Sequence, residues 1–237
     1  MLNAISAAQV AMNQDQLKMQ AVSQNISNMQ TPAYQRFILT ESGFDEHLAA
    51  NIENISKKMR QNHLQEQGTL TQTHRPLDVA ISGRGYFQVQ TENGVFYTRR
   101  GDFHINERGE LTTASSALVL GKNGPVHIDE GDFIIDRTGH LFIDKQKIDQ
   151  LNVVDFKNDS SLSYAGHGLY QCNTAPEPVN SATYILQGFV EQSNVKSIDE
   201  MTEMLKISRH FEASQKIMRM ADALISSAVN QLGEGNV

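Results

Sequence analysis

Two heptad patterns, one near each end of the 237-residue chain, most constrain what it can fold into. The first combines two rows of residues spaced seven apart: Ile5, Met12, Met19 and Ile26, with Ala8, Asp15, Val22 and Met29 three residues after each. Seven of these eight residues are apolar, and such a narrow seam is typical of helices that pair as a coiled coil. Pro32 forces Thr31 out of the helical region, so we expect this assembly helix to lie within residues 1–30.

The second seam lies near the C-terminus and has the same spacing. Its rows are Met204, Phe211, Met218, Ile225 and Leu232, with the apolar or small residues Ile207, Ser214, Ala221 and Ala228 between them. Residues 197–200 (SIDE) match a capping box and predict the start of a helix, and Gly233 predicts its end. We therefore expect a C-terminal assembly helix and tail within residues 188–237. Phe211 is the only aromatic residue of this seam, so we expect it to be its largest anchor.

A seam of this kind needs a partner, and pairing the two terminal helices would bury both stripes. One interpretation is a helical hairpin that closes a monomer. However, a two-helix pair covers only one side of each helix, and the many methionines suit further adaptable contacts. The pattern therefore favours packing between chains over a self-contained hairpin.

Between the two helices the hydrophobic period changes to that of strands. Residues 77–81, 86–89 and 95–98 alternate, and Asn93-Gly94 is a hairpin signal between the last two runs. Residues 101–111 and 131–141 share the frame GDFxIxxxGxL, which predicts two related hairpins in one antiparallel sheet or small barrel. We thus expect an α+β protein with a β-rich middle domain at 68–187, inserted between the paired terminal helices, and a polar connector at 31–67.

Composition excludes several classes of partner. The formal net charge is −7 and no basic stripe is present, which argues against nucleic acid. No apolar run is long enough to span a bilayer, so no membrane insertion is expected. The first basic residue is Lys18, so the charged start of a cleaved secretory signal is missing.

No motif in the sequence carries recognisable chemistry. The eight histidines lack the spacing of metal ligands, and no phosphate-binding loop or nucleophile elbow is present. We therefore expect no catalytic residue, no metal and no cofactor. One alternative is a secreted enzyme or binding module, for which His104, His127 and His140 on neighbouring predicted strands are the candidates. Another alternative is a cytosolic coiled-coil scaffold.

Four separated blocks of sequence resemble the flagellar rod and hook proteins of bacteria. They are residues 23–34 (SQNISNMQTPAY), 68–87, 97–103 (YTRRGDF) and 187–195 (QGFVEQSNV). The positions that carry the family signature are Asn25, Asn28, Thr31, Pro32, Pro76, Leu77, Asp78, Ser193 and Asn194. Ala33 and His74 stand where the family commonly has Gly, which puts a left-handed turn after Thr31-Pro32 in question.

The resemblance implies a structural subunit and not an enzyme. Such proteins leave the cell through the flagellar type III export apparatus without a cleaved signal. They polymerise with themselves and other rod subunits into a tube that crosses the periplasm and transmits torque from motor to hook. The terminal helices would form the inner layer and the β-rich domain the outer one. The short middle domain and the tail at 226–237 favour the proximal rod subunit over the distal one.

Overall fold

The computed structural model describes residues 2–40, 60–64, 66–128, 133–156, 162–180 and 182–234. The chain divides into two compact units. The helical unit comprises Met1–Ser27, Phe37–Leu64 and Lys196–Val237, and the β-rich unit comprises Asn28–Arg36 and Gln65–Val195. The segment expected as a connector, 31–67, is thus shared between the two units.

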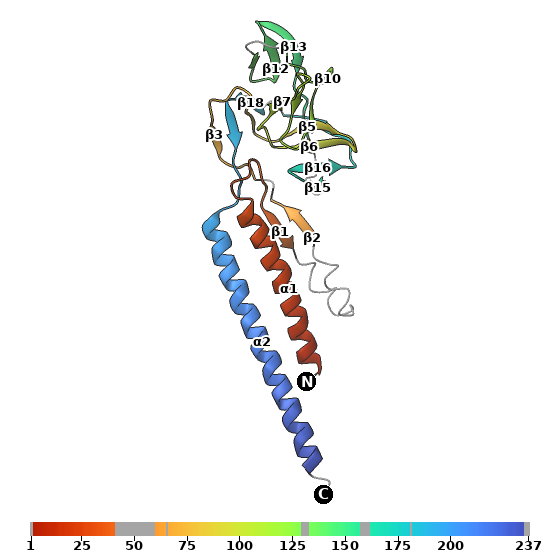
Figure 1. The fold of residues 1–237 in the computed structure, drawn as a ribbon, viewed down its shortest axis with the longest axis vertical. Helices are drawn as coiled ribbons and strands as arrows, with labels where there is room; N and C mark the ends of the chain where they lie inside the picture. Colours follow the sequence, from red (N-terminus) through yellow and green to blue (C-terminus); the bar gives the residue numbers. More distant parts are fainter. Residues whose placement is uncertain are drawn as a thin grey trace. The chain divides into compact units, whose positions relative to one another are not determined.

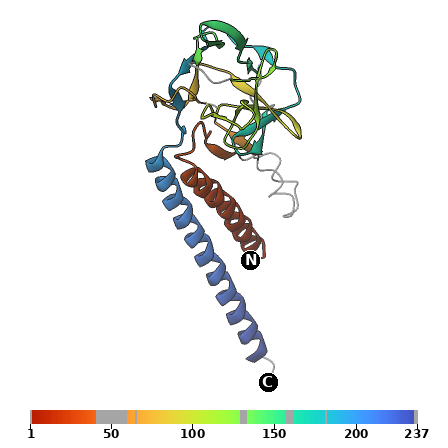
Figure 2. The same ribbon diagram turned by 45° about the horizontal axis from the view of Figure 1, so that its top comes forward.

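The helical unit contains the two terminal helices expected from the seams. They are α1 (Leu2–Ser27) and α2 (Ser197–Glu234), and they lie side by side in opposite directions (Figure 1 and Figure 2). Two short strands, β1 (Phe37–Thr40) and β2 (Arg60–His63), pair antiparallel in the same unit. The α+β class and the helix at each end of the chain are therefore confirmed.

The helix start predicted from residues 197–200 is confirmed at Ser197, but the amide of Glu200 does not bond as in a capping box. The amide of Glu200 donates to the carbonyl of Lys196 at 3.1 Å, as in an ordinary helical turn. The Glu200 side chain accepts a hydrogen bond from Asn25 at 3.1 Å. A capping box and a contact with α1 would each use a carboxylate at position 200. In this structure the Glu200 carboxylate contacts Asn25 of α1.

The β-rich unit is built from antiparallel pairs. Its strands are β3 (Leu70–Gln72), β4 (Val79–Ser82), β5 (Tyr86–Thr91), β6 (Gly94–Thr98), β7 (His104–Ile105), β8 (Leu111–Thr112), β9 (Leu118–Gly121), β10 (Gly124–Pro125), β11 (Phe133–Ile135), β12 (His140–Ile143), β13 (Gln146–Gln150), β14 (Val153–Asp155), β15 (Leu162–Gly166), β16 (Leu169–Cys172), β17 (Glu177–Pro178), β18 (Tyr184–Gln187) and β19 (Phe189–Glu191). The main sheet has the order β15-β16-β6-β5-β9-β8-β7, and β11-β12-β13 form a second sheet. The first strands of the unit pair with its last ones, β3 with β19 and β4 with β18.

Alternating residues of these strands fill one main core. Phe87 and Phe103 are fully buried and meet edge to face, with ring centroids 5.2 Å apart. A second cluster gathers Tyr86, Tyr97 and Tyr170 around Phe156. Burial, helped by neighbouring tyrosines, raises the pKa of Tyr170 well above its usual value.

The internal repeat folds as two hairpins with the same turn. The side-chain Oδ1 of Asn106 accepts from the amides of Arg108 and Glu110, both at 2.9 Å. Thirty residues later, Oδ1 of Asp136 accepts from the amides of Thr138 and His140 at 2.9 and 2.8 Å. The related hairpins are confirmed, but they belong to separate sheets and not to one, because β7 and β8 join the main sheet while β11 and β12 pair with β13.

Left-handed backbone occurs at both positions where the sequence lacks the usual glycine. Ala33 has φ +54° and His74 has φ +58°. The amide of Ala33 donates to the carbonyl of Glu191 at 2.8 Å, and that of His74 to the carbonyl of Gly188 at 3.2 Å. These bonds hold a conformation that L-residues adopt at a cost of about 1–2 kcal/mol. The question raised by Ala33 is therefore answered, since the turn forms without glycine.

Candidate functional site: the helix seam and the chain junction

Most of the predicted seam residues lie on α1 and α2, whereas Met29 lies two residues beyond the end of α1, in the β-rich unit. Val22 and Ile207 are buried. The half-buried members are Ile5, Met12, Met19, Ile26, Met29, Met204, Phe211, Met218 and Ile225. The side chain of Leu232 lies outside the described residues.

The most buried row of each helix is not the row of large side chains. On α1 it consists of Ala8, Asp15 and Val22, and on α2 of Glu200, Ile207 and Ser214, again seven apart. Small and polar residues thus share the middle of the contact with Val22 and Ile207, while the half-buried seam methionines and Phe211 flank it. Because the flanking side chains are only half covered, they keep apolar surface that the hairpin itself does not use.

Two hydrogen bonds set the register of the helices. His210 Nδ1 lies 2.6 Å from the carboxylate of Asp15, which is buried. Ten residues further along α1, Asn25 Nδ2 donates to Glu200, which lies ten residues before His210 on α2. The helices therefore run antiparallel with no slip between these two points.

Of the signature residues, Asn25 is the one that lies in the helical unit. Its side chain is 1% exposed, and that of Glu200 is fully buried. Asn25 Oδ1 accepts from the amide of Phe37 at 2.8 Å, and Nδ2 donates to the Phe37 carbonyl at 2.9 Å. The amide thus pairs with Phe37 as a neighbouring strand would, and it ties α1, β1 and α2 together.

The remaining N-terminal signature residues form a tight turn in the β-rich unit. The amide of Thr31 donates to the carbonyl of Asn28 at 2.9 Å, and their side chains meet at 3.3 Å. Pro32 follows, and the left-handed Ala33 completes the reversal. These residues therefore direct the chain that leaves α1.

The central and C-terminal signature residues also hold the backbone. Asp78 accepts from the amide of Gly188 through its carbonyl at 2.7 Å, and the Pro76 carbonyl accepts from Gln187 Nε2 at 3.0 Å. Leu77 packs against the main core. Ser193 Oγ accepts from the amide of Val195 at 3.2 Å. Asp78, Pro76 and Ser193 therefore hold the path of the backbone, while Leu77 contributes to the core.

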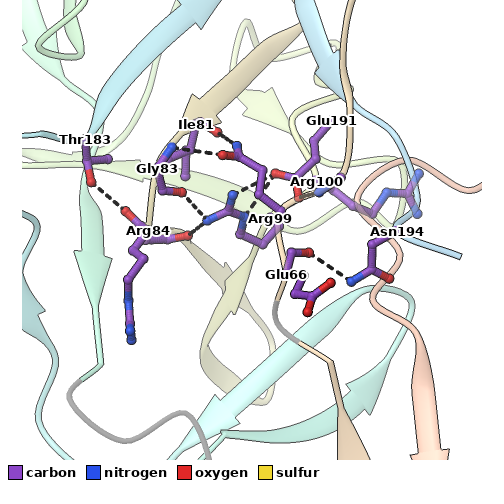
Figure 3. Close-up of polar contacts among 12 residues, drawn as sticks. Glu66, Ile81, Gly83, Arg84, Arg99, Arg100, Thr183, Glu191 and Asn194 are labelled. Carbon is purple, nitrogen blue, oxygen red and sulfur yellow. Dashed lines mark hydrogen bonds and ion pairs between the residues drawn. The ribbon is translucent and has the colours of Figure 1, made fainter.

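Asn194 lies where three stretches of the β-rich unit meet (Figure 3). Its Oδ1 accepts from the amide of Arg36 at 2.6 Å, and its Nδ2 donates to the carbonyl of Glu66 at 2.9 Å. Its own amide donates to the carbonyl of Tyr34 at 3.2 Å. One side chain thereby joins the peptide that follows α1, the peptide that enters the strands and the peptide that precedes α2.

Beside Asn194 lies a buried ion pair that sequence reasoning missed. Arg99 Nε and Nη2 donate to Glu191 Oε2 at 3.1 and 2.8 Å, and the two residues are 6% and 3% exposed (Figure 3). Arg99 Nη1 donates to the carbonyls of Gly83 and Gly85 at 2.9 and 2.8 Å. Both residues lie inside the blocks that carry the family resemblance. They are 92 positions apart, so the sequence did not indicate that they pair.

The histidines do not form a site. Among the described residues, no three His, Cys, Asp or Glu side chains lie close enough to hold a metal ion, so His104, His127 and His140 do not converge. His140 is engaged by Asp136 and Thr138 within its own hairpin. Neither helix of the described chain has an apolar stretch long enough to cross a bilayer.

Two family descriptions match the chain. Residues 186–232 match the C-terminal region of the flagellar basal body rod FlgEFG proteins, and residues 80–146 match the D1 domain of the flagellar hook protein FlgE/F/G family. The first covers α2 and the strands before it, and the second covers much of the β-rich unit.

Curated relatives agree with these matches. The FlgF rod protein of Caulobacter vibrioides is 36% identical over 72% of this chain and 71% of its own length. The FlgF of Mesorhizobium japonicum is 34% identical over 70% of the chain and 71% of its own length. The FlgG of Bacillus subtilis is 28% identical over 97% of the chain and 99% of its own length. All three are named as flagellar basal-body rod proteins, a structural class and not an enzymatic one. The chain therefore belongs to the family of flagellar basal-body rod proteins.

Proposed function

We propose that this chain polymerises with itself and with other rod subunits, through its terminal helices, into the tube of the flagellar basal-body rod. There it would pass torque from motor to hook. The observation that carries this proposal is apolar surface on α2 that α1 leaves uncovered. Ile198, Met201 and Leu205 are 79%, 53% and 62% exposed.

A second group of exposed apolar residues lies further along α2. Ile217, Met220 and Leu224 follow one another at helical spacing and are 48%, 52% and 61% exposed. Shallow grooves of about 550 Å³ also run along the helices, one of them lined by Met19 and Met204. Within each group the exposed apolar residues lie on one side of α2, and such surfaces suit contact with further helices.

The heptad spacing and the fixed register support coiled-coil pairing of α1 and α2 within the subunit. The helices would then form the inner layer of the tube and the β-rich unit the outer layer. Many modest helix contacts, repeated in each subunit, would add up to a torsionally stiff assembly. We further propose export by the flagellar type III apparatus without a cleaved signal, and a periplasm-spanning location.

Within the family we propose the proximal rod position. The two FlgF relatives are the more similar in identity, at 36% and 34% against 28% for the FlgG of Bacillus subtilis. A map of an intact basal body that locates this chain would test the assignment. Density for the chain beside the hook, and not at the motor side, would overturn it.

A charge placed in the first exposed group, formed by Ile198, Met201 and Leu205, tests polymerisation itself. Leu205→Glu should leave the isolated chain folded, because exposed substitutions usually change stability by no more than about 0.5 kcal/mol. The same variant should not enter the rod, since a glutamate would be buried against a neighbouring helix. Val95→Glu, at a 42% exposed position of β6, is the matched control and should assemble normally.

Deletion of residues 1–30 gives a second test. The truncated chain should keep a folded, soluble β-rich unit but fail to join the rod. Motile cells built with the truncated chain, or with Leu205→Glu, would contradict assembly through the helices.

A further inference from the structure

The β-rich unit is closed by its own last strands. β3 and β4 each form a two-stranded sheet, and their strand partners are β19 and β18. Leu70 lies opposite Glu191, and Val79 opposite Gln187. In the described structure, the strands that open the unit therefore rely on the strands that end it for their ladder hydrogen bonds.

Glu191 occupies the centre of this closure. Its Oε2 accepts both hydrogen bonds from Arg99, and its Oε1 accepts from the amide of Gly68 at 3.0 Å. Its main-chain carbonyl accepts from the amide of Ala33 at 2.8 Å. A Cβ on Gly68 would lie 1.9 Å from the carbonyl oxygen of Gln192, so the entering and leaving chains touch without room for a side chain.

The closure depends on the buried ion pair between Arg99 and Glu191. Arg99 carries a guanidinium, and burial of an unpaired guanidinium is strongly unfavourable. Two carbonyls, of Gly83 and Gly85, satisfy Nη1, and the carboxylate of Glu191 supplies the opposite charge. The pair joins residues 92 positions apart, so it forms only when the end of the unit has docked.

Asn194 extends the closure to both connections of the unit. It bonds the backbone at Tyr34 and Arg36, which lead from α1, and at Glu66, which leads into β3. Asn194 itself lies three residues before the start of α2. The two peptides that connect the strands to the helices are thus fastened to each other inside the β-rich unit.

We propose that Glu191 and Asn194 form a mechanical lock that transmits twist. Through these hydrogen bonds, both connecting peptides are held to each other and to the strands of the β-rich unit. Twist that reaches these peptides from the helices would then pass to the strands through the junction and not through two separate linkers. This inference rests on the proposed function as a rod subunit, and it assigns the transmission of force to named atoms.

The test compares two isosteric variants that each remove one carboxylate beside an arginine. Glu191→Gln leaves the buried Arg99 without its counter-charge. Asp102→Asn does the same to Arg100, whose pair is more exposed, at 17% and 19%. Both are expressed in place of the natural copy in a motile host, and both are purified as full-length chains.

Hydrogen exchange measured by mass spectrometry gives the first result. In Glu191→Gln, peptides covering 28–36, 66–72 and 189–195 should exchange about a hundredfold faster, because the loss of one partner of a buried pair opens the structure locally. Peptides of β5 and β6 should be unchanged. Asp102→Asn should match the natural chain throughout.

Swimming in media of rising viscosity gives the second result. Glu191→Gln should enter the rod in normal amount, yet lose speed more steeply with viscosity than the natural chain or Asp102→Asn. Asn194→Ser, whose shorter side chain cannot reach both Arg36 and Glu66, should behave in the same direction and serves if Glu191→Gln does not assemble.

Junction exchange equal to that of the natural chain, or an increase spread evenly over the whole β-rich unit, would overturn the lock. So would an unchanged response to viscosity in assembled variants. Failure of the proposed function has a different signature, in which the natural chain itself is absent from basal bodies or is dispensable for motility.

Discussion

Asn25 and Glu200, 175 residues apart in sequence, share a buried hydrogen bond of 3.1 Å where the end of α1 meets the start of α2. Asn25 also satisfies both backbone groups of Phe37. A single amide therefore decides how the chain leaves one helix and where the other helix begins.

Replacing the Asn25 side chain should lower the free energy of unfolding of the helical unit. Asn25→Ala leaves the backbone groups of Phe37 and the buried Glu200 without this partner, at a cost of about 3 kcal/mol. Urea unfolding followed by the helical circular-dichroism signal measures the change. Ser23→Ala, at an exposed position two residues earlier, should change little. An equal loss in both variants would show that Asn25 has no special role.

Phe211→Ala should separate assembly from folding of the β-rich unit. The aromatic ring belongs to the helical unit and is half-buried, so the melting of the β-rich unit should stay unchanged while incorporation into rods falls sharply. Phe87→Ala, in the main core, should lower that melting transition, since truncating a buried Phe costs about 3–5 kcal/mol. A lowered β-rich transition in Phe211→Ala would contradict this prediction.

His74→Gly should stabilise the β-rich unit. The residue is exposed, its φ is +58°, and glycine adopts that conformation without the steric cost. We expect a gain of about 0.5–1 kcal/mol after the greater freedom of the unfolded chain is counted. His104→Gly, on exposed strand β7, should instead be destabilising. Thermal melting of both variants decides the matter, and a loss of stability in His74→Gly would be inconsistent with backbone strain there.

The repeated turn gives a prediction about pH. Burial raises the pKa of Asp136, but hydrogen bonds from Thr138 and His140 outweigh it and lower that pKa below its usual value. Because the folded-state pKa is the lower one, the stabilisation is present above the unfolded pKa of about 4 and is lost as pH falls through the folded value. Asp136→Asn keeps an oxygen for the same two amides, so melting curves at descending pH should show a weaker acid loss. An identical acid loss in the variant would contradict the assignment.

The reverse change in the first copy of the turn should not be equivalent. Asn106 Nδ2 donates to the carboxylate of Glu110 at 2.8 Å, so Asn106→Asp would set two carboxylates together. The variant should be less stable near neutral pH and recover as the pH falls. Equal effects of the two substitutions at neutral pH would show that the neighbouring side chain does not matter.

Hydrophobic period was enough to predict the two helices. It also predicted strands at 77–81, 86–89 and 95–98, and the structure has them at 79–82, 86–91 and 94–98. The period reports which side of an element is apolar, and this property is local. It did not predict that Asp15 would be buried, because its partner His210 lies 195 residues away. In the heptad pattern, Asp15 stood out only as the one polar residue among eight.

The ion pair of Arg99 with Glu191 could not be predicted from the sequence for the same reason. Arg99 and Glu191 are ordinary charges in the sequence, and their pairing depends on how β19 returns to β3. Ala33 was judged by the intrinsic preference of its residue type. The bond from its amide to Glu191 holds it in a conformation that this preference disfavours.

The unequal lengths of the helices give the hairpin two unlike ends. By the register of Asp15 with His210 and Asn25 with Glu200, Leu2 at the start of α1 lies level with Ala223, and α2 continues to Glu234 (Figure 1). Within the described chain, the last turns of α2 thus have no residue of α1 beside them. One end of the hairpin therefore has two helices and the other has one, so copies stacked head to tail would bring unlike ends together. A polymer built in this way would be polar, with two ends that differ in structure.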